Sequence, residues 1–330
     1  MNVPTGHTVT LEPSGETFPV AVGQRLLEAA RNAGFWLPFE CGWGSCGTCK
    51  ATLVDGDIER LFPAAPAISE RDVRRSRVLL CQSSANSDLT IRPLRIESGP
   101  ESGRATRSMT GTVVSSVEVG PSLFDLHVYV GEDVDFRPGQ FAILQRDDGL
   151  RRCYSLAGQP GNASLRFVFK RYEGRPFSTW LSERRAGEPL ALEAPYGDVW
   201  IRPAARPLVL VAGGTGISAI LGLAQEAAAS LRHRHLTVVY GARTMHDLVL
   251  RGELHQAVRA HQNGRLVVAV AAGPPGEGVS VGQVADALWE VDLSEADVYL
   301  AGPPGMVDAV ESMLTASNIE RDRLFVDRYG

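Results

Sequence analysis

The stretch CGWGSCGTC, residues 41–49, holds three of the five cysteines in the chain. Cys41, Cys46 and Cys49 follow the spacing C-x4-C-x2-C, and the next cysteine is Cys81 in RVLLCQ. Three cysteines on one loop and a fourth much later is the plant-type [2Fe-2S] spacing, whereas structural zinc usually takes its cysteines as two short pairs. The spacing therefore predicts a [2Fe-2S] cluster ligated by Cys41, Cys46, Cys49 and Cys81.

The remaining positions of this loop are mostly small. Gly42, Gly44 and Gly47 can adopt positive φ angles and leave space where a Cβ would collide. We expect their conformations to bring backbone N–H groups close to the sulfur atoms. Such hydrogen bonds help to set the reduction potential of a cluster.

Composition limits the functional classes. A chain of 330 residues has room for two or three domains, and its formal net charge of -5 without a polybasic tract disfavours nucleic acid as a partner. The first 20 residues lack the pattern of an export signal, and no apolar run reaches the roughly 18 residues that cross a bilayer. An odd number of cysteines disfavours a disulfide framework. We therefore expect a cytoplasmic protein with no membrane partner.

The region around the cysteine loop has the pattern of a small sheet-and-helix domain. HTVTLEP and TFPVAV alternate as strands, RLLEAARNAG has helical spacing, and CKATLVDGDI suggests a hairpin with an Asp-Gly turn. With its cysteines, the segment resembles a plant-type ferredoxin domain, a β-grasp fold. We assign residues 1–97 to this domain and the polar stretch 98–108 to a linker.

Residues 109–204 contain short strands divided by Gly and Pro turns, which predicts an antiparallel β-barrel. Within them, RRCYSLAG places Arg152 and Tyr154 on one face of a strand, suited to a phosphate and to a flat heterocycle. Taken alone, a tyrosine in a strand is more often simply packed in the core than part of a binding site. Cys153 is expected to face away from that site.

Residues 205–330 predict a doubly wound, Rossmann-like parallel sheet. RPLVLVAGGTGISAILGLAQ is an apolar strand, a glycine-rich turn and a helix, and further apolar strands follow. Gly214, Gly216 and Ala219 fit G-x-G-x-x-A at the helix start, where backbone amides hold a pyrophosphate. The alternative is a tight turn of small packing residues.

The order of these parts resembles the ferredoxin-NADP reductase superfamily. The resemblance implies that Arg152 contacts the flavin pyrophosphate, that Tyr154 stacks on the isoalloxazine and that Ser155 lies near its N5. Tyr154 and Ser155 are the implied catalytic residues. KRYEGRPFSTWL resembles the second flavin phosphate loop, with one extra proline. LAGPPGM resembles the C-G-P-P motif beside the nicotinamide, with Ala301 in place of cysteine, and Ala219 stands where proline is usual. The implied cofactor-binding residues beyond the R-x-Y-S motif are Gly174, Ser178, Thr179, Gly213, Gly214, Thr215, Gly216, Arg243, Gly302, Pro303 and Pro304.

As a whole, the chain resembles the reductase components of bacterial multicomponent oxygenases. The resemblance implies that electrons pass from NADH through FAD and the [2Fe-2S] cluster, one at a time, to a Rieske ferredoxin or a terminal oxygenase. That oxygenase would be a Rieske dioxygenase or a diiron monooxygenase. Two alternatives stay open, a reductase of the same build in deoxysugar biosynthesis and a non-enzymatic sensor that binds zinc and a nucleotide.

The coenzyme preference has signals in both directions. After the second strand of the nucleotide domain, TVVYGARTMHD offers Arg243 before the first acid, Asp247, and an arginine there can pair with the 2'-phosphate of NADPH. The resemblance favours NADH, and Ala242 replaces a serine that is typical of strict NADP relatives. We predict that NADH is preferred and NADPH is accepted more weakly.

Arginines outnumber acids between residues 60 and 95. A solvated mixed surface is the simpler interpretation, and electrostatic steering of a partner is the alternative. The arginines are Arg60, Arg71, Arg74, Arg75, Arg77, Arg92 and Arg95.

Overall fold

The computed structural model describes residues 6–39, 41–44, 46–94, 96, 104, 106–317 and 319–328. The chain forms two compact units, Met1–Thr106 with Arg151–Cys153, and Arg107–Leu150 with Tyr154–Gly330. Most of the predicted linker 98–108 lies outside the described residues, and its last two residues already belong to a strand that begins at Arg107. In the described part of the chain, no helix is both long and apolar enough to span a membrane.

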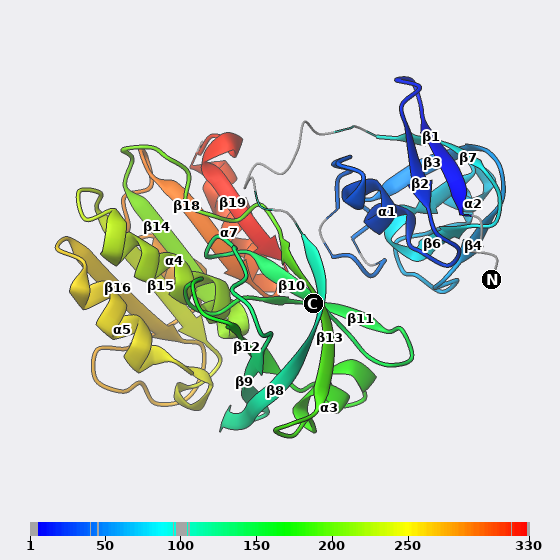
Figure 1. The fold of residues 1–330 in the computed structure, drawn as a ribbon. Helices are drawn as coiled ribbons and strands as arrows, with labels where there is room; N and C mark the ends of the chain where they lie inside the picture. Colours follow the sequence, from blue (N-terminus) through cyan, green and yellow to red (C-terminus); the bar gives the residue numbers. More distant parts are fainter. Residues whose placement is uncertain are drawn as a thin grey trace. The chain divides into compact units, whose positions relative to one another are not determined.

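The first unit is a mixed sheet in the order β2-β1-β7-β3-β5 with helix α1 beside it (Figure 1). Strands β1 and β2 are antiparallel, whereas β1 and β7 are parallel, as in a β-grasp fold. The elements are β1 (His7–Leu11), β2 (Thr17–Val20), α1 (Leu26–Asn32), β3 (Lys50–Asp55), β4 (Ile58–Arg60), α2 (Glu70–Arg74), β5 (Arg77–Leu79), the 3₁₀ turn η1 (Leu80–Gln82), β6 (Ser83–Ala85) and β7 (Leu89–Pro93).

The predicted alternation of buried and exposed residues in β1 is confirmed, but the hairpin predicted around the Asp-Gly turn at residues 55–56 is wrong. Val9 and Leu11 are buried on one face of β1. The Asp-Gly turn does not pair the strands on its two sides, because β3 pairs with β5 and β7 whereas β4 pairs with β6. Gly56 has φ +96°, and a Cβ there would lie 2.3 Å from the carbonyl oxygen of Asp88. The turn therefore redirects the chain to a second sheet, and a close backbone approach requires its glycine.

The second unit begins with the predicted antiparallel barrel. Its strand order is β11-β10-β13-β8-β9-β12, and a bridge between Leu156 and Phe167 joins the end of β11 to β12 and closes the sheet. Phe167 and Leu126 are fully buried inside it. The elements are β8 (Arg107–Gly120), β9 (Leu123–Tyr129), β10 (Phe141–Gln145), β11 (Arg151–Ser155), β12 (Ser164–Lys170), α3 (Pro176–Ser182) and β13 (Pro189–Tyr196).

The unit continues as the predicted doubly wound sheet, parallel throughout, in the order β17-β16-β15-β14-β18-β19. The elements are β14 (Leu208–Gly213), η2 (Gly214–Gly216), α4 (Ile217–Ser230), β15 (Leu236–Ala242), η3 (Met245–Asp247), α5 (Arg251–Ala260), β16 (Gly264–Val270), β17 (Ser280–Val281), α6 (Val284–Leu288), β18 (Asp297–Gly302), α7 (Pro304–Ala316), η4 (Arg321–Arg323) and β19 (Leu324–Arg328).

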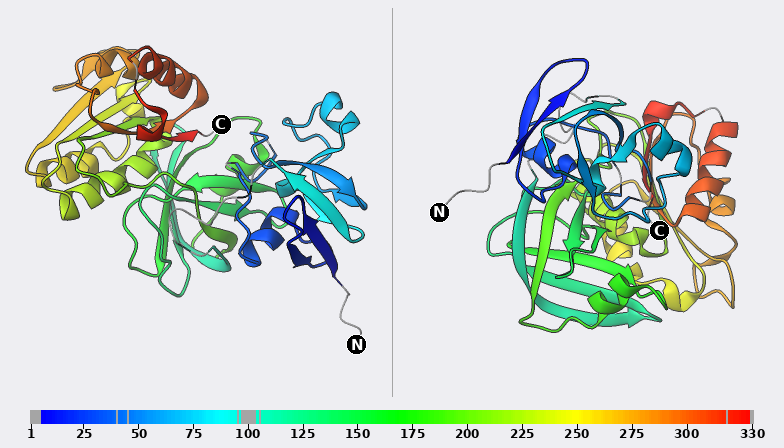
Figure 2. Two further views of the ribbon diagram at one scale, coloured as in Figure 1. Left: turned by 90° about the horizontal axis from the view of Figure 1, so that it is seen from above. Right: turned by 90° about the vertical axis from the view of Figure 1, so that its right-hand side faces the viewer.

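Both faces of this sheet are covered by helices (Figure 2). Leu208 and Leu210 of β14 pack toward α4 and α5, whereas Val209 and Val211 pack toward α6 and α7. The chain moves from β14 to one side through β15 and β16, then returns to the other side at β18. The strand order therefore reverses between β14 and β18, the position where open α/β sheets bind their ligands.

A buried ionic group lies at the start of β18. The side chains of Asp297 and Arg234 are both fully buried, with 2.7 Å between Asp297 Oδ2 and Arg234 Nη2. Arg206 Nε donates to Asp297 Oδ1 at 2.7 Å, and Arg234 Nη1 donates to the carbonyl oxygen of Arg202 at 3.1 Å. These contacts join Arg202 and Arg206, which precede β14, to Asp297 at the start of β18.

Polar contacts also hold the barrel against the parallel sheet. Ser218 at the start of α4 donates to the carbonyl oxygen of Val168 in β12 and accepts from its N–H. Arg166 of β12 pairs with Asp125 of β9 and with Glu253 of α5. These contacts fix the edge of β12 beside the carboxyl end of the parallel sheet.

Candidate functional site

The four predicted metal-ligating cysteines come together as two pairs. Sγ atoms of Cys49 and Cys81 are 3.3 Å apart, although the residues are 32 positions apart in the chain. The thiol of Cys41 contacts that of Cys46 and accepts a hydrogen bond from the Cys46 N–H at 3.4 Å. Thr48 N–H donates to the Cys46 sulfur at 3.5 Å. The pairs match the needs of a [2Fe-2S] cluster, in which four cysteines ligate two irons.

Within each pair the two thiols shift one another's pKa in opposite directions. A hydrogen bond with Cys41 lowers the pKa of Cys46 to about 4, and one with Cys81 lowers the pKa of Cys49. The pKa of Cys81 is raised by its hydrogen bond with Cys49 and by burial, and the charges at Cys41 and Cys46 add to this. These mutual shifts arise because the two thiols of each pair are in direct contact, and all four cysteines bind a cluster as thiolates.

The loop conformation agrees with the prediction for its glycines. Gly42, Gly44 and Gly47 have φ angles of 65°, 97° and 80°. A Cβ on Gly44 would lie 3.0 Å from the Cβ of Ala65 and 3.1 Å from Cγ of Gln82. Ala67 N–H donates to the carbonyl oxygen of Gly44 at 3.1 Å, so a second segment covers the loop. Among the described residues, no three or more His, Cys, Asp or Glu side chains gather in the geometry that holds a single metal ion.

The predicted flavin residues lie on two elements of the barrel that touch. Arg152, Tyr154 and Ser155 belong to β11, and Ser178 and Thr179 belong to α3. The Tyr154 ring packs against Phe177 of α3, with ring centroids 5.9 Å apart. The two motifs, which are separated in sequence, therefore meet in the fold.

The loop before α3 is held by its own side chains. Gly174 has φ +69°, and a Cβ there would meet no atom within 4 Å. Ser178 is buried, accepts from the N–H of Tyr172 at 3.1 Å and donates to the carbonyl oxygen of Arg175 at 3.3 Å. Gly174 thus borders open space in a loop that Ser178 holds to Tyr172 and Arg175.

Sequence reasoning missed the partner of Ser155. Its hydroxyl donates to Asp327 Oδ2 at 2.6 Å, and Asp327 lies in β19, 172 positions later. Such a contact has no local sequence signal, since it depends on β19 at the edge of the parallel sheet reaching the barrel. The carboxylate fixes the direction of the serine hydroxyl.

A cavity of about 350 Å³ lies at the carboxyl ends of the parallel strands. It contains five of the predicted coenzyme residues, Gly213, Gly214, Thr215, Arg243 and Pro303. Gly214 has φ +53°, and a Cβ there would meet nothing within 4 Å, so its backbone faces open space. Gly216, Gly302 and Pro304 are not among the lining residues. The cavity thus presents glycine backbone where a pyrophosphate can approach.

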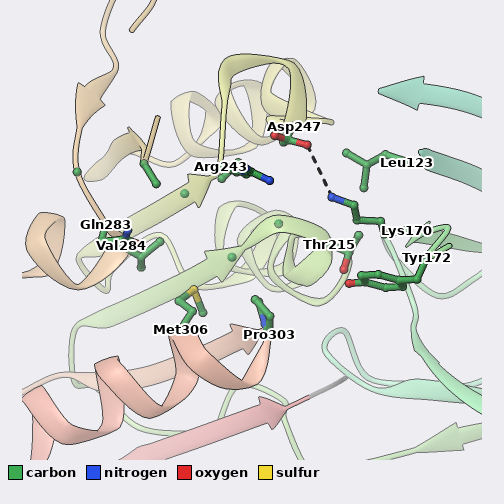
Figure 3. A pocket seen from close by; sticks show the side chains of 16 residues that line it. Leu123, Lys170, Tyr172, Thr215, Arg243, Asp247, Gln283, Val284, Pro303 and Met306 are labelled. Carbon is green, nitrogen blue, oxygen red and sulfur yellow. Dashed lines mark ion pairs between the residues drawn. The ribbon is translucent and has the colours of Figure 1, made fainter. Parts of the chain in front are cut away.

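Met306 explains two of the glycines around this cavity. A Cβ on Gly213 would lie 2.2 Å from Met306 Sδ, and one on Gly302 would lie 2.4 Å from Met306 Cε. Met306 itself lines the cavity and lies beside Pro303 (Figure 3). Gly302 therefore serves the packing of α7 on the strand ends. Met306, the last residue of LAGPPGM, was not among the predicted site residues.

The other end of the cavity is charged and partly formed by the barrel. Arg243 and Asp247 follow β15, and Lys170 and Tyr172 come from the end of β12 (Figure 3). Lys170 Nζ lies 4.0 Å from Asp247 Oδ1. Asp247 Oδ2 also accepts from the N–H and the hydroxyl of Thr244, which holds the carboxylate in place. Arg243 is one of the predicted coenzyme residues, whereas Asp247 and Lys170 are not.

Comparison with known proteins agrees with this arrangement. Residues 9–86 match the 2Fe-2S iron-sulfur cluster binding domain, and residues 210–312 match the oxidoreductase NAD-binding domain. Terephthalate 1,2-dioxygenase reductase component 2 of Comamonas sp is 32% identical over 93% of this chain and 92% of its own. The anthranilate 1,2-dioxygenase electron transfer component of Acinetobacter baylyi is 34% identical, over 98% and 97%.

The chain belongs to the family of oxygenase reductase components. A solved relative, the ferredoxin reductase in carbazole 1,9a-dioxygenase, superposes with a TM-score of 0.88 at 28% identity and covers 98% of both chains. This reductase is therefore an NAD(P)H-dependent oxidoreductase whose cofactors are a [2Fe-2S] cluster, FAD and NADH. Its relatives include reductase and electron transfer components of terephthalate and anthranilate dioxygenase systems.

Proposed function

We propose that this reductase passes electrons from NADH, through FAD in the barrel and a [2Fe-2S] cluster on the cysteine loop, to a Rieske ferredoxin or terminal oxygenase. The observation that carries the proposal is the pairing of four thiols in the same chain as the coenzyme cavity. The proposed division is a ferredoxin domain at 1–97, a flavin barrel at 109–204 and a nicotinamide domain at 205–330. NADH delivers two electrons together, and a flavin releases them singly.

The residues of the chain have separate tasks in this proposal. Cys41, Cys46, Cys49 and Cys81 would hold the [2Fe-2S] cluster, which would supply one-electron transfer. Arg152 and the Gly174 loop, with Ser178 and Thr179, bind the flavin phosphates, and Tyr154 stacks on the ring. The Gly213–Gly216 turn and the Gly302–Pro304 segment receive the coenzyme. Lys170, at the end of β12 in the barrel, lines the same cavity as Gly213 and Gly214, which supports a shared site for NADH and the flavin.

Ser155 is expected to act in the step in which the flavin is reduced by NADH. Ser155 gives its one hydroxyl proton to Asp327, so the oxygen presents a fixed lone pair to other groups, and loss of a preorganised polar group at a reacting atom costs about 100-fold in rate. We expect Ser155→Ala to slow anaerobic flavin reduction by NADH about 100-fold in rapid-mixing measurements, and Ser155→Thr to restore most of the rate. Ser182→Ala, on the far turn of α3, is the control. A Ser155→Ala protein with the wild-type rate would refute this role.

Coenzyme choice tests the charged end of the cavity. We expect a higher kcat/KM for NADH than for NADPH, measured with ferricyanide as acceptor. Arg243→Ala should lower kcat/KM for NADPH about tenfold, since it removes a charge-assisted pair with the 2'-phosphate worth roughly 1.5 kcal/mol. It should leave kcat/KM for NADH nearly unchanged. A higher kcat/KM for NADPH in the wild-type protein contradicts the preference, and an unchanged ratio in Arg243→Ala contradicts the assignment.

Reconstitution tests the proposed acceptor. The purified reductase with NADH should reduce an isolated Rieske ferredoxin or a Rieske or diiron oxygenase component anaerobically, as seen in the visible spectrum of the acceptor. Reduction should require both the flavin and the cluster. A reductase that reduces small dyes but none of these components would contradict the proposed acceptor while leaving the internal electron path intact.

A further inference from the structure

Positive charge collects on one short helix of the ferredoxin unit. Residues 69–77, SERDVRRSR, contain four arginines and two acids, and we refer to them as the α2 basic segment. Arg71, Arg74 and Arg75 are exposed. The other arginines of the 60–95 region are more dispersed. Arg92 lies in β7 and pairs with Glu12 at 2.6 Å, and Arg95 lies outside the described residues.

Both acids of this segment are already engaged. Asp72 accepts hydrogen bonds from the hydroxyl and the N–H of Ser69, which with Lys50 hold its pKa below the usual range, and it pairs with Lys50 Nζ at 3.0 Å. Glu70 lies 3.7 Å from Arg74. The charges of Asp72 and Glu70 are thus matched by Lys50 and Arg74. The positive surplus falls on Arg71, Arg75 and the half-buried Arg77.

This segment is anchored to the cysteine loop. Lys50, which pairs with Asp72, directly follows Cys49, and a Cβ on Gly47 would lie 3.3 Å from its Cε. Ala67, just before the segment, donates its N–H to Gly44. On the other side the chain passes from α2 into β5 and reaches Cys81. The Asp72–Lys50 pair therefore holds the helix beside the end of the loop, and the Ala67–Gly44 hydrogen bond holds the chain just before it.

The adjoining part of the loop is the accessible one. Cys46 is exposed, whereas Cys49 and Cys81 are buried. Because electron transfer needs close approach, an acceptor must come to the Cys46 side. Val73, between the arginines of α2, is 42% exposed and offers an apolar centre within the basic rim. Apolar contact surrounded by charge is the usual composition of a docking surface.

We propose that the α2 basic segment docks an acidic surface of the protein that accepts electrons from the cluster. The inference deepens the proposed function, on which it rests, by naming the charge of the partner surface. The chain as a whole is acidic, with a formal charge of -5, so an acidic partner is repelled elsewhere and attracted here. Such steering raises association rates by tenfold or more and weakens as salt shortens the Debye length.

Two forms of cytochrome c provide a matched pair of probe acceptors. The native protein is basic, and exhaustive succinylation makes it acidic while keeping the haem. Each NADH is oxidised to NAD⁺ and a proton and gives two electrons, which reduce two ferric haems to ferrous. We expect kcat/KM for succinylated cytochrome c to fall about tenfold as ionic strength rises from about 0.01 M to about 1 M, where the Debye length shortens from about 30 Å to about 3 Å. The rate with native cytochrome c should stay level or rise.

Neutral variants locate the effect. In Arg71→Gln/Arg74→Gln/Arg75→Gln, kcat/KM for succinylated cytochrome c at low salt should fall about tenfold and lose most of its salt dependence. Arg259→Gln/Arg265→Gln/Arg321→Gln is the matched control, since it removes three exposed arginines from the parallel-sheet region. The control should keep the wild-type salt profile. Equal losses in both triple variants, or faster reduction of native than of succinylated cytochrome c at low salt, would overturn the proposal.

A separate readout tells failure of the docking surface from failure of the proposed function. The NADH:ferricyanide rate and the visible spectrum of the cluster should be the same in the wild-type protein and both triple variants. If the wild-type protein lacks a cluster or cannot reduce either cytochrome, the proposed function fails. If it reduces both and the α2 variant behaves as the wild type does, only the docking surface is wrong.

Discussion

Cys46→Ala is expected to lose the [2Fe-2S] cluster. Its cytochrome c reductase activity should fall more than about 100-fold as a result. Changes to residues that only orient metal ligands already cost 10- to 100-fold, so loss of a ligand costs more. Cys46 is paired with Cys41, and each of the four cysteines binds the cluster as a thiolate. Iron and acid-labile sulfide analysis with the visible spectrum checks the loss.

The flavin provides the internal control for this variant. Ferricyanide takes electrons from the flavin without the cluster, so the NADH:ferricyanide rate of Cys46→Ala should stay within about twofold of the wild type. Cys153→Ala, which removes the cysteine outside the predicted ligand set, should keep the cluster. Full iron and sulfide content in Cys46→Ala would show that Cys46 is not a ligand.

Asp297→Asn is expected to destabilise the second unit by about 3–5 kcal/mol. The side chains of Asp297 and Arg234 are both fully buried, and removal of one charge leaves the other desolvated without its counter-ion. Arg206 loses its carboxylate partner as well. A loss of this size should lower the melting temperature by roughly 10 °C, measured by calorimetry of the protein with its cofactors bound.

An exposed pair provides the comparison for this variant. Glu290 lies 3.7 Å from Arg265, and the two side chains are 75% and 55% exposed. Exposed pairs contribute between zero and about 1 kcal/mol, so Glu290→Gln should shift the melting temperature by less than about 3 °C. If the two variants melt at the same temperature, the buried group around Asp297 does not stabilise the sheet as described.

Features encoded in short segments could be predicted from the sequence. The spacing of Cys41, Cys46 and Cys49 and the glycines between them dictate a local loop, and the apolar run before Gly213 with the turn after it dictates a strand and a helix. The alternation in HTVTLEP likewise gave β1 its buried face. Each of these depends on residues a few positions apart, and the structure contains the loop, the turn and the strand.

Features that depend on pairing between distant segments could not be predicted. The Asp-Gly turn has the local pattern of a hairpin, but the strands on its two sides lie in different sheets. β3 pairs with β7 and β4 pairs with β6, and both partners come from later in the chain. The Ser155–Asp327 contact joins the barrel to the last strand, and Lys170 enters the coenzyme cavity from β12. Gly302 fitted a coenzyme motif, yet its nearest neighbour is the Met306 side chain. Such contacts follow from tertiary packing and leave no local pattern.

Electrons from NADH are expected to reach the cluster only through the flavin. Anaerobic rapid mixing of the reductase with NADH, followed at flavin and cluster wavelengths, tests this directly. The flavin should be reduced first and the cluster afterwards, and in protein stripped of flavin the cluster should stay oxidised until FAD is added back. Reduction of the cluster by NADH in the flavin-free protein would contradict the account.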